Sequence, residues 1–254
     1  MTLPSVSRGL SDQHTSHSSR IRAHAFWELT LLLRNGEQLL LMFIVPVGLL
    51  LALGLTNLST KSINSAVPTV FAVSIIATCF TSLAIGTGFE RRSGALRYLG
   101  TTPLTRFDLL VGKIIATAAL TLMSITAISI TGFFLDWSPS LSGIAQALVV
   151  AILAITAWTS WAMVIAGMFR AEAVLAIANG LFLVFIMFGG VIIASSQMPK
   201  AVGNIIDLLP SAALANGLRS ALELGSLPVL PIIVLAIWAA VGMYVARRTF
   251  KWEP

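Results

Sequence analysis

The chain has 254 residues, of which 57% are hydrophobic and only 10% are charged, and its formal net charge at pH 7 is +6. A soluble domain carries about 25% charged residues, so this composition excludes a soluble globular protein. The basic residues flank apolar segments and do not collect on one soluble face, which argues against a nucleic-acid partner.

The first 19 residues are polar and rich in serine, which predicts a disordered tail. They do not resemble a signal peptide, because no apolar segment follows the first basic residue closely enough. All three histidines, His14, His17 and His24, lie in this tail or shortly after it. We therefore expect no metal site and no Ser–His dyad within the membrane spans.

Residues 20–37 predict an amphipathic helix at the cytoplasmic interface of the membrane. Ile21, Phe26 and Leu29 recur at helical spacing, and charged side chains such as Arg22 lie between them. The alternative is a plain extension of the first membrane span.

Six segments without Asp, Glu, Lys or Arg reach the length of about 20 residues that a transmembrane helix needs. These charge-free windows are residues 38–60, 62–89, 114–135, 137–169, 173–199 and 224–246. They predict helices at 38–57, 66–89, 110–134, 142–168, 173–194 and 227–246. The expected fold is all-α and polytopic, with a six-span domain over 38–246 and a cytoplasmic tail over 247–254. Pro46 predicts a kink in the first span.

The loops differ in their content of Lys and Arg. With these spans, 13 of the 16 basic residues lie on the side of the chain termini, and only Lys61, Lys200 and Arg219 lie on the opposite side. The excess of Lys and Arg in cytoplasmic loops predicts that both termini are cytoplasmic.

Two segments between spans are neither spans nor simple loops. Residues 90–113 combine many charges with apolar side chains, which suits a short helix docking onto another protein, or else a loop that only sets topology. Residues 195–226 are too apolar for a solvated loop and too charged for a span. They predict two short helices in the outer leaflet, broken at Pro210, or an interfacial flap that only packs.

Two patterns within the spans suggest a cargo path or a subunit interface. Ser74, Thr78, Ser82 and Gly86 recur every four residues on the second predicted span. Tight packing against a neighbouring helix is the alternative for this stripe. On the fifth span, aromatic side chains recur every three residues beside Met187 and Asn179, as suits apolar ligands, lipid contact or core packing. The aromatic residues are Phe182, Phe185 and Phe188.

The sequence lacks the groups that would power transport. No Asp, Glu, Lys or Arg lies in the middle of a span, although proton- and ion-coupled transporters usually need such a residue. The only Gly-Lys pair, Gly112-Lys113, lacks the spacing of a phosphate-binding loop. The single cysteine, Cys79, excludes a disulfide framework and lies in an apolar segment, where it is expected to pack as an inert side chain. We expect no cofactor in this chain and no catalytic activity of its own.

The charged segment after the second span resembles the ABC-2 type permeases. The matching residues are Glu90-Arg91-Arg92-Ser93-Gly94-Ala95-Leu96-Arg97-Tyr98-Leu99, Thr101-Thr102-Pro103-Leu104-Thr105-Arg106 and Leu110-Val111-Gly112-Lys113. A weaker match comprises Gly189-Gly190, Met198-Pro199, Pro210 and Arg219. Arg97 stands where the family often has an acid, and Ser211-Ala212-Ala213-Leu214 replaces a more usual sequence after the proline. Within the family, the chain looks most similar to actinobacterial permeases of the daunorubicin-exporter kind.

The resemblance implies two permease subunits, identical or related, on two cytoplasmic ATP-binding cassette ATPase subunits that hold ATP and Mg. Segment 91–106 would contain a coupling helix, and Phe169-Arg170-Ala171-Glu172 a shorter contact with the ATPase. Glu90 would tie the end of the second span to the N-terminal helix, unless it is an ordinary interfacial charge. Closure of the ATPases would rearrange spans two and five at the dimer interface. The implied coupling residues are Glu90, Arg91, Arg92, Gly94, Leu96, Arg97, Leu99, Pro103, Arg106, Arg170 and Glu172.

The expected function is therefore the permease subunit of an ATP-driven exporter in a bacterial inner membrane, in contact with membrane lipid. Its cargo would be a hydrophobic or amphipathic small molecule, such as a drug-like compound, a lipid or a glycolipid. The alternatives are a scaffold that recruits a cytoplasmic partner and carries nothing, an intramembrane enzyme, and a carrier that works without an ATPase.

Overall fold

The computed structural model describes residues 17–55 and 62–249, and every regular element in these ranges is a helix. The elements are α1 (His17–Arg34), α2 (Gly36–Leu55), α3 (Ile63–Ile76), the π-helix η1 (Ala77–Ser82), α4 (Leu83–Arg92), α5 (Ala95–Gly100), α6 (Arg106–Phe134), α7 (Leu141–Met168), α8 (Ala171–Phe188), the 3-10 helix η2 (Ser195–Gln197), α9 (Lys200–Ile206), α10 (Pro210–Leu222) and α11 (Val229–Thr249).

The two predicted tails need correction where the structure describes them. Residues 17–19 belong to α1 and residues 247–249 to α11, because each helix continues beyond the predicted boundary. The rest of the tail predictions, 1–16 and 250–254, lies outside the described residues. The amphipathic helix predicted at 20–37 is present as α1, which ends at Arg34, and α2 follows it from Gly36.

Five helical segments of the described chain are long and apolar enough to cross a membrane. They are Ile63–Arg92, Arg106–Phe134, Leu141–Met168, Ala171–Phe188 and Val229–Thr249. The pair Lys200–Ile206 and Pro210–Leu222 would add one more if it formed a single span, but it is bent by 96°. The structure thus shows a polytopic all-α membrane protein.

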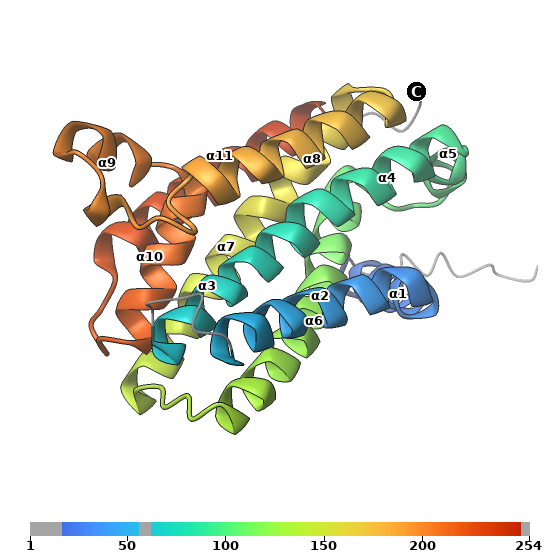
Figure 1. The fold of residues 1–254 in the computed structure, drawn as a ribbon. Helices are drawn as coiled ribbons and strands as arrows, with labels where there is room; N and C mark the ends of the chain where they lie inside the picture. The colour runs from blue at the N-terminus through green and yellow to red at the C-terminus, as the bar shows by residue number, and fades with distance from the viewer. Residues whose placement is uncertain (1–16, 56–61, 250–254) are drawn as a thin grey trace, which may run out of the picture.

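The first predicted span corresponds to α2, whose apolar part, Met42–Gly54, is shorter than the other spans. The whole helix has 20 residues and continues through Pro46 without a break. At a rise of about 1.5 Å per residue it reaches about 30 Å, the thickness of a bilayer core. The end of α11 returns to the end of the bundle where α1 and α5 lie (Figure 1). This return requires an even number of crossings, so α2 acts as the sixth.

The centre of the bundle is formed by the segments Ile63–Arg92 and Leu141–Met168, which are the most buried of the spans. Small residues permit the closest approaches, as is typical of helices in membranes. Gly143 of α7 lies directly against the backbone of Ala221 in α10, and Gly242 of α11 lies against the Trp161 ring of α7. The outward faces of α8 and α11 carry exposed apolar side chains such as Leu183 and Ile237, which suits contact with lipid.

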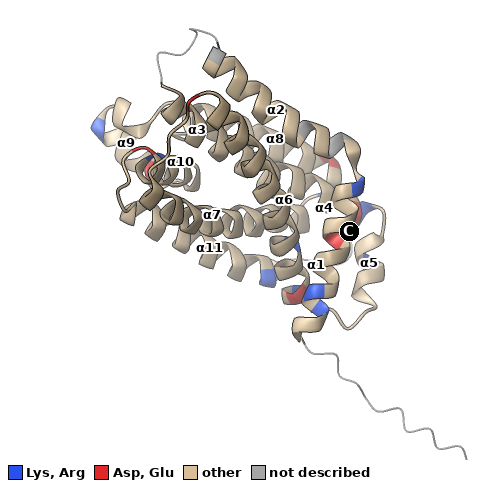
Figure 2. Ribbon diagram, turned by 90° about the horizontal axis from the view of Figure 1, so that it is seen from below, with Lys and Arg blue, Asp and Glu red and all other residues tan. Residues whose placement is uncertain are grey.

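The charged residues of the described chain concentrate at one end of the bundle (Figure 2). We call this the basic end; it comprises α1, the end of α4, α5, the start of α6, the turn between α7 and α8, and the end of α11. The opposite end, which carries α9 and α10, is the far end. The break predicted at Pro210 is confirmed, because α10 begins at this residue after the turn that follows α9.

Candidate coupling site at the basic end

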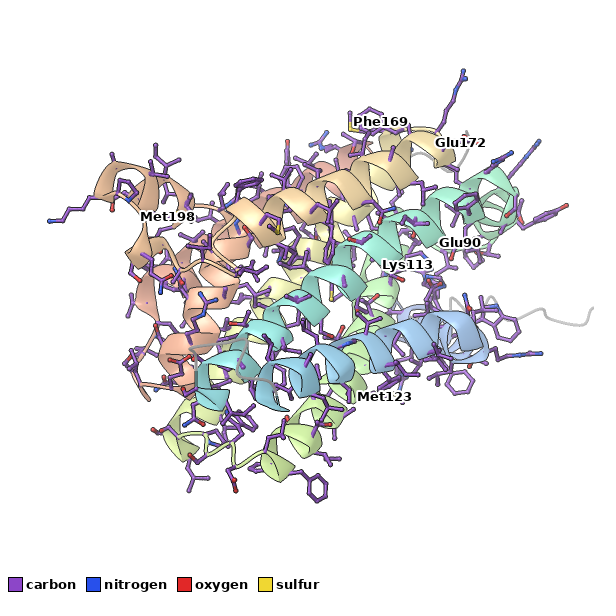
Figure 3. All side chains as sticks on the ribbon, in the orientation of Figure 1. Glu90, Lys113, Met123, Phe169, Glu172 and Met198 are labelled. Atoms are coloured by element: carbon purple, nitrogen blue, oxygen red, sulfur yellow. The ribbon has the colours of Figure 1, made fainter. Side chains whose placement is uncertain are left out.

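The basic end contains a buried ion cluster centred on Lys113 of α6. The Lys113 side chain is fully buried, and its Nζ donates to the Glu28 carboxylate of α1 and to Glu90 Oε2 of α4 at 2.9 Å. A buried ammonium is stable only when carboxylates compensate its lost hydration. Figure 3 shows Glu90 and Lys113 approaching from neighbouring helices. The cluster therefore joins α1, α4 and α6.

This geometry refines the implied role of Glu90. Glu90 does connect the end of α4 with α1, but it does so through Lys113. Sequence reasoning assigned no such role to Lys113 or Glu28. The available signal was the position of Lys113 at the edge of a long charge-free window, where a lysine entering the bundle needs acidic partners.

A second ionic contact between α1 and α6 is made by Asp108. His17 Nδ1 lies 3.0 Å and Arg20 Nε 3.3 Å from the Asp108 carboxylate, which is fully buried. The same carboxylate accepts from the Thr105 backbone N–H at 3.0 Å, and Thr105 Oγ1 accepts from the Asp108 N–H at 3.1 Å. This capping box starts α6, so Asp108 both begins the helix and binds α1.

The two ionic contacts flank a close approach between His24 and Gly112. A Cβ atom on Gly112 would overlap His24 Cδ2, so any other residue at this position would displace the His24 ring. Burial of the imidazole lowers the pKa of His24, with the Lys113 charge also lowering it and Glu28 opposing. The polar face of α1 thus points into the protein, while Phe26 and Trp27 on the other face are exposed. Arg22 and Arg34 are exposed as well, so charged and apolar side chains both lie on the outer side of α1.

The end of α4 contacts the turn between α7 and α8. The Arg91 side chain is buried, and its guanidinium donates to the backbone carbonyls of Gly167 and Phe169. Arg92 forms an ion pair with Glu172 in the first turn of α8. The two segments implied as ATPase contacts, 91–106 and 169–172, are therefore neighbours (Figure 3).

The predicted helix between spans two and three is present as α5. Gly94 precedes it with φ +79°, a left-handed conformation that favours glycine. Leu96 is fully buried and belongs to one apolar cluster with Leu109, Leu110 and Met163, whereas Tyr98 is 77% exposed.

The implied contact of Leu96 and Arg91 with an ATPase needs correction. Both side chains are buried within this chain, so a partner could not touch them. Their place is to hold α5 and α4 on the bundle. The other implied coupling residues are half-buried or exposed: Glu90, Arg92, Gly94, Arg97, Leu99, Pro103, Arg106, Arg170 and Glu172.

The polar stripe of the second span does not lie on one face in the structure. Ser74 is buried and its hydroxyl pairs with Ser124 of α6 at 3.0 Å, and Thr78 is also buried. Ser82 is half-buried and Gly86 is exposed, with open space beyond it. The unpredicted π-helix η1 lies between these ends and shifts the residues around the helix axis. Cys79 is buried, with Sγ 3.3 Å from Thr121 Oγ1.

The residues suggested on the fifth span also differ in burial. Phe182 and Phe185 are half-buried, and the Phe185 ring lies 5.1 Å from Trp158, centroid to centroid. This placement matches core packing. Asn179 and Met187 lie on the exposed face of α8, as does Phe188. Of the nine suggested path or interface residues, only Gly86, Asn179, Met187 and Phe188 are exposed.

At the far end, Arg219 of α10 makes a contact that sequence reasoning did not assign. Its guanidinium donates to the carbonyls of Gly190, at 3.2 Å, and Val191, and to Thr69 Oγ1 of α3 at 3.1 Å. Arg219 therefore ties α10 to the turn after α8 and to α3. Its position in the weaker sequence match was the signal that could have found it.

The fold and these contacts define a polytopic membrane protein with an anchored, exposed short helix at its basic end. The sequence model described as ABC-2 type transporter matches residues 20–222. The chain belongs to this family. Comparison with curated proteins finds no match.

Proposed function

We propose that this chain is the permease subunit of an ATP-driven exporter, powered by a separate ATP-binding cassette ATPase. The observation that carries the proposal is α5, whose Leu96 is held in the bundle while Tyr98 and Arg97 remain exposed. Such a helix offers an aromatic and a basic side chain to a partner. It would also transmit movement imposed by that partner to the helix bundle. ATP and Mg would bind the partner ATPase, because this sequence has no phosphate-binding loop.

The proposed orientation places the basic end in the cytoplasm of a bacterial cell, with both termini inside. The excess of Lys and Arg in the loops at this end supports it. The exposed apolar side chains Phe26 and Trp27 of α1 would then lie in the inner leaflet of the cytoplasmic membrane. The cargo would leave toward the far end, as a hydrophobic or amphipathic molecule such as a drug-like compound, a lipid or a glycolipid.

A second permease subunit, identical or related, would pack on the exposed face of α8. Asn179 and Gly180 lie on this face near the middle of the helix, and Gly86 of α4 is exposed as well. No side chain fills the space beyond Gly86 or Gly180. Small and polar residues on a lipid-exposed helix suit close contact with another helix. Two ATPase subunits would then bind the two copies of α5.

The proposal is tested by purifying the chain together with a candidate ATP-binding cassette ATPase in lipid nanodiscs. We expect a stable complex whose ATP hydrolysis responds to amphipathic compounds. Tyr98→Ala should weaken ATPase binding at least tenfold, because it removes an exposed aromatic contact. Arg34→Met, at an exposed arginine of α1 outside α5, is the matched control.

Two outcomes would decide against the proposal. Wild-type protein that moves an amphipathic dye across vesicles without any ATPase would indicate a carrier. A stable ATPase complex with no nucleotide-dependent transport of any amphipathic probe would indicate a scaffold.

A further inference from the structure

The buried guanidinium of Arg91 lies where three helices meet. Its Nη1 and Nη2 donate to the carbonyl oxygens of Gly167 and Phe169, and the side chain is only 5% exposed. Helix α7 ends at Met168, so these carbonyls belong to its last turn and its C-cap. Arg91 itself belongs to the last turn of α4. It therefore links the C-terminal ends of α4 and α7.

The chemistry of this contact requires arginine. The last carbonyls of a helix have no partners within the helix and carry its negative dipole end, so a cation is favoured there. The planar fork of a guanidinium can donate to two carbonyls at once, whereas a lysine ammonium supplies only a point charge. Helix dipole and fork geometry together account for an arginine buried against neutral groups.

The neighbouring Arg92 makes a weaker link to the start of α8. Its ion pair with Glu172 joins side chains that are 61% and 63% exposed, and pairs as exposed as this one contribute little to stability. Glu172 also favours the first turn of α8 through the positive dipole end. Of the two arginines, Arg91 thus makes the stronger link between α4 and the α7–α8 turn.

Helix α5 is also attached to the ends of α4 and α7. It follows α4 after the Gly94 turn, and Leu96 belongs to the same buried apolar cluster as Met163 of α7. The segment 169–172 and α5 are therefore both fixed to the ends of α4 and α7. Helix α8 begins at Ala171, directly after the carbonyls that Arg91 holds.

We propose that Arg91 is a positioning residue that makes α5 and the α7–α8 turn one rigid surface and transmits movement of α5 to α8. The transmission part rests on the proposed function, because it needs an ATPase that pushes α5. The rigid surface is a property of this chain alone. Arg91 would act without touching the ATPase, since it is buried.

The rigid surface is tested without an ATPase, by hydrogen–deuterium exchange of the chain in lipid nanodiscs. In Arg91→Met, amides of residues 169–174 should exchange at least tenfold faster than in wild type. Arg91→Lys should lie between the two, because it keeps the charge and loses the fork. Arg34→Met should match wild type, and Arg92→Gln should change exchange less than threefold.

Unchanged exchange of residues 169–174 in Arg91→Met would overturn the proposal. If Arg91→Met does not fold, Arg91→Lys carries the test by itself: exchange equal to wild type there would refute the need for the two-carbonyl fork. Faster exchange spread equally over α11, which Arg91 does not contact, would also count against it by indicating a general loss of stability.

The transmission part is tested in the ATPase complex with a spin label at Val184→Cys, on the exposed face of α8. Cys79 is fully buried and does not compete for the label. Trapping ATP with vanadate should change the wild-type spectrum, and Arg91→Met should remove most of the change while binding the ATPase as wild type does. An equal response in both proteins would refute transmission through Arg91. If no ATPase binds wild type, the proposed function fails, and the exchange result still decides the rigid surface.

Discussion

The two ends of the bundle are held together by different kinds of contact. At the basic end, charged side chains from separate helices meet, as Lys113 does with Glu28 and Glu90. At the far end, backbones lie close together, as Gly143 does against Ala221. Arg219 at the far end donates to the backbone carbonyls of Gly190 and Val191, as Arg91 does to two carbonyls at the basic end.

The kind of contact at each end determines how that end can respond to force. A lysine such as Lys113 can keep its contacts while helices shift by a small distance, because its four-carbon stem has rotatable bonds, whereas the planar fork of Arg91 holds its two carbonyls in a fixed geometry. Close-packed backbones cannot keep their contacts through such a shift, since interiors of this kind have few voids and little compressibility. This comparison favours the basic end as the part that moves and the far end as the frame. The following predictions test it, in order of decreasing effect on stability.

The largest effect is expected for Lys113→Met. The substitution leaves Glu28 and Glu90 near each other without their shared cation. Breaking a buried ion pair costs about 3–5 kcal/mol, so the melting temperature in detergent should fall most in this variant. Adding Glu28→Gln and Glu90→Gln should restore much of the loss. A triple variant as unstable as the single one would show that charge is not what holds α1.

Gly143→Ala should follow, because its neighbour is a backbone atom that cannot move aside. The new Cβ would lie 1.8 Å from the Ala221 carbonyl oxygen, so α7 and α10 must separate. Overpacking of this severity costs about 3 kcal/mol, measurable as a lower melting temperature. Gly48→Ala, where nothing lies within 4 Å of the new atom, is the control and should be near neutral.

Arg219→Met should cost about 2 kcal/mol, since it leaves the Gly190 and Val191 carbonyls without their donor. The measurement is again thermal unfolding, and limited proteolysis should show earlier cleavage near residue 190. Lys200→Met, at an exposed lysine of the same end, is the control. Equal behaviour of the two variants would contradict the role given to Arg219.

Gly112→Ala should cost only about 1 kcal/mol, although its Cβ would also make a severe contact, 2.4 Å from His24 Cδ2. The neighbour here is a side chain, and His24 can rotate in response. His24→Ala combined with Gly112→Ala should be more stable than the two separate losses predict. A loss as large as that of Gly143→Ala would remove the contrast between the ends.

The smallest effect concerns pH. Burial lowers the pKa of His24 below its ordinary 6.5, so the unfolded chain binds a proton more readily than the folded one. Stability is therefore complete above about pH 6.5 and falls on acidification toward the folded pKa. Between pH 7.5 and 6 the loss is at most about 0.8 kcal/mol. Melting curves of wild type and His24→Gln should diverge in this range, and parallel curves would contradict the assignment.

The positions of the membrane helices could be predicted from sequence because the bilayer excludes charge. Five of the six charge-free windows became long apolar helices, and Pro210 broke the far-end segment where expected. The charged, glycine-punctuated stretch after the second span likewise predicted α5. These features depend on local composition, because any segment that enters lipid must satisfy its backbone polar groups within its own helix.

The partners of individual side chains required the tertiary structure. Arg91 and Arg92 are adjacent and chemically identical, yet the first is buried on two carbonyls and the second is exposed beside Glu172. Successive residues of a helix point about 100° apart, so their surroundings depend on where α7 and α8 lie. The π-helix η1 contains no glycine or proline by which it could be predicted. It changes the helical spacing between Ser74 and Gly86, which the polar stripe assumed to be regular. Composition determined which segments enter the membrane, and packing between helices distant in sequence decided which way each side chain faces.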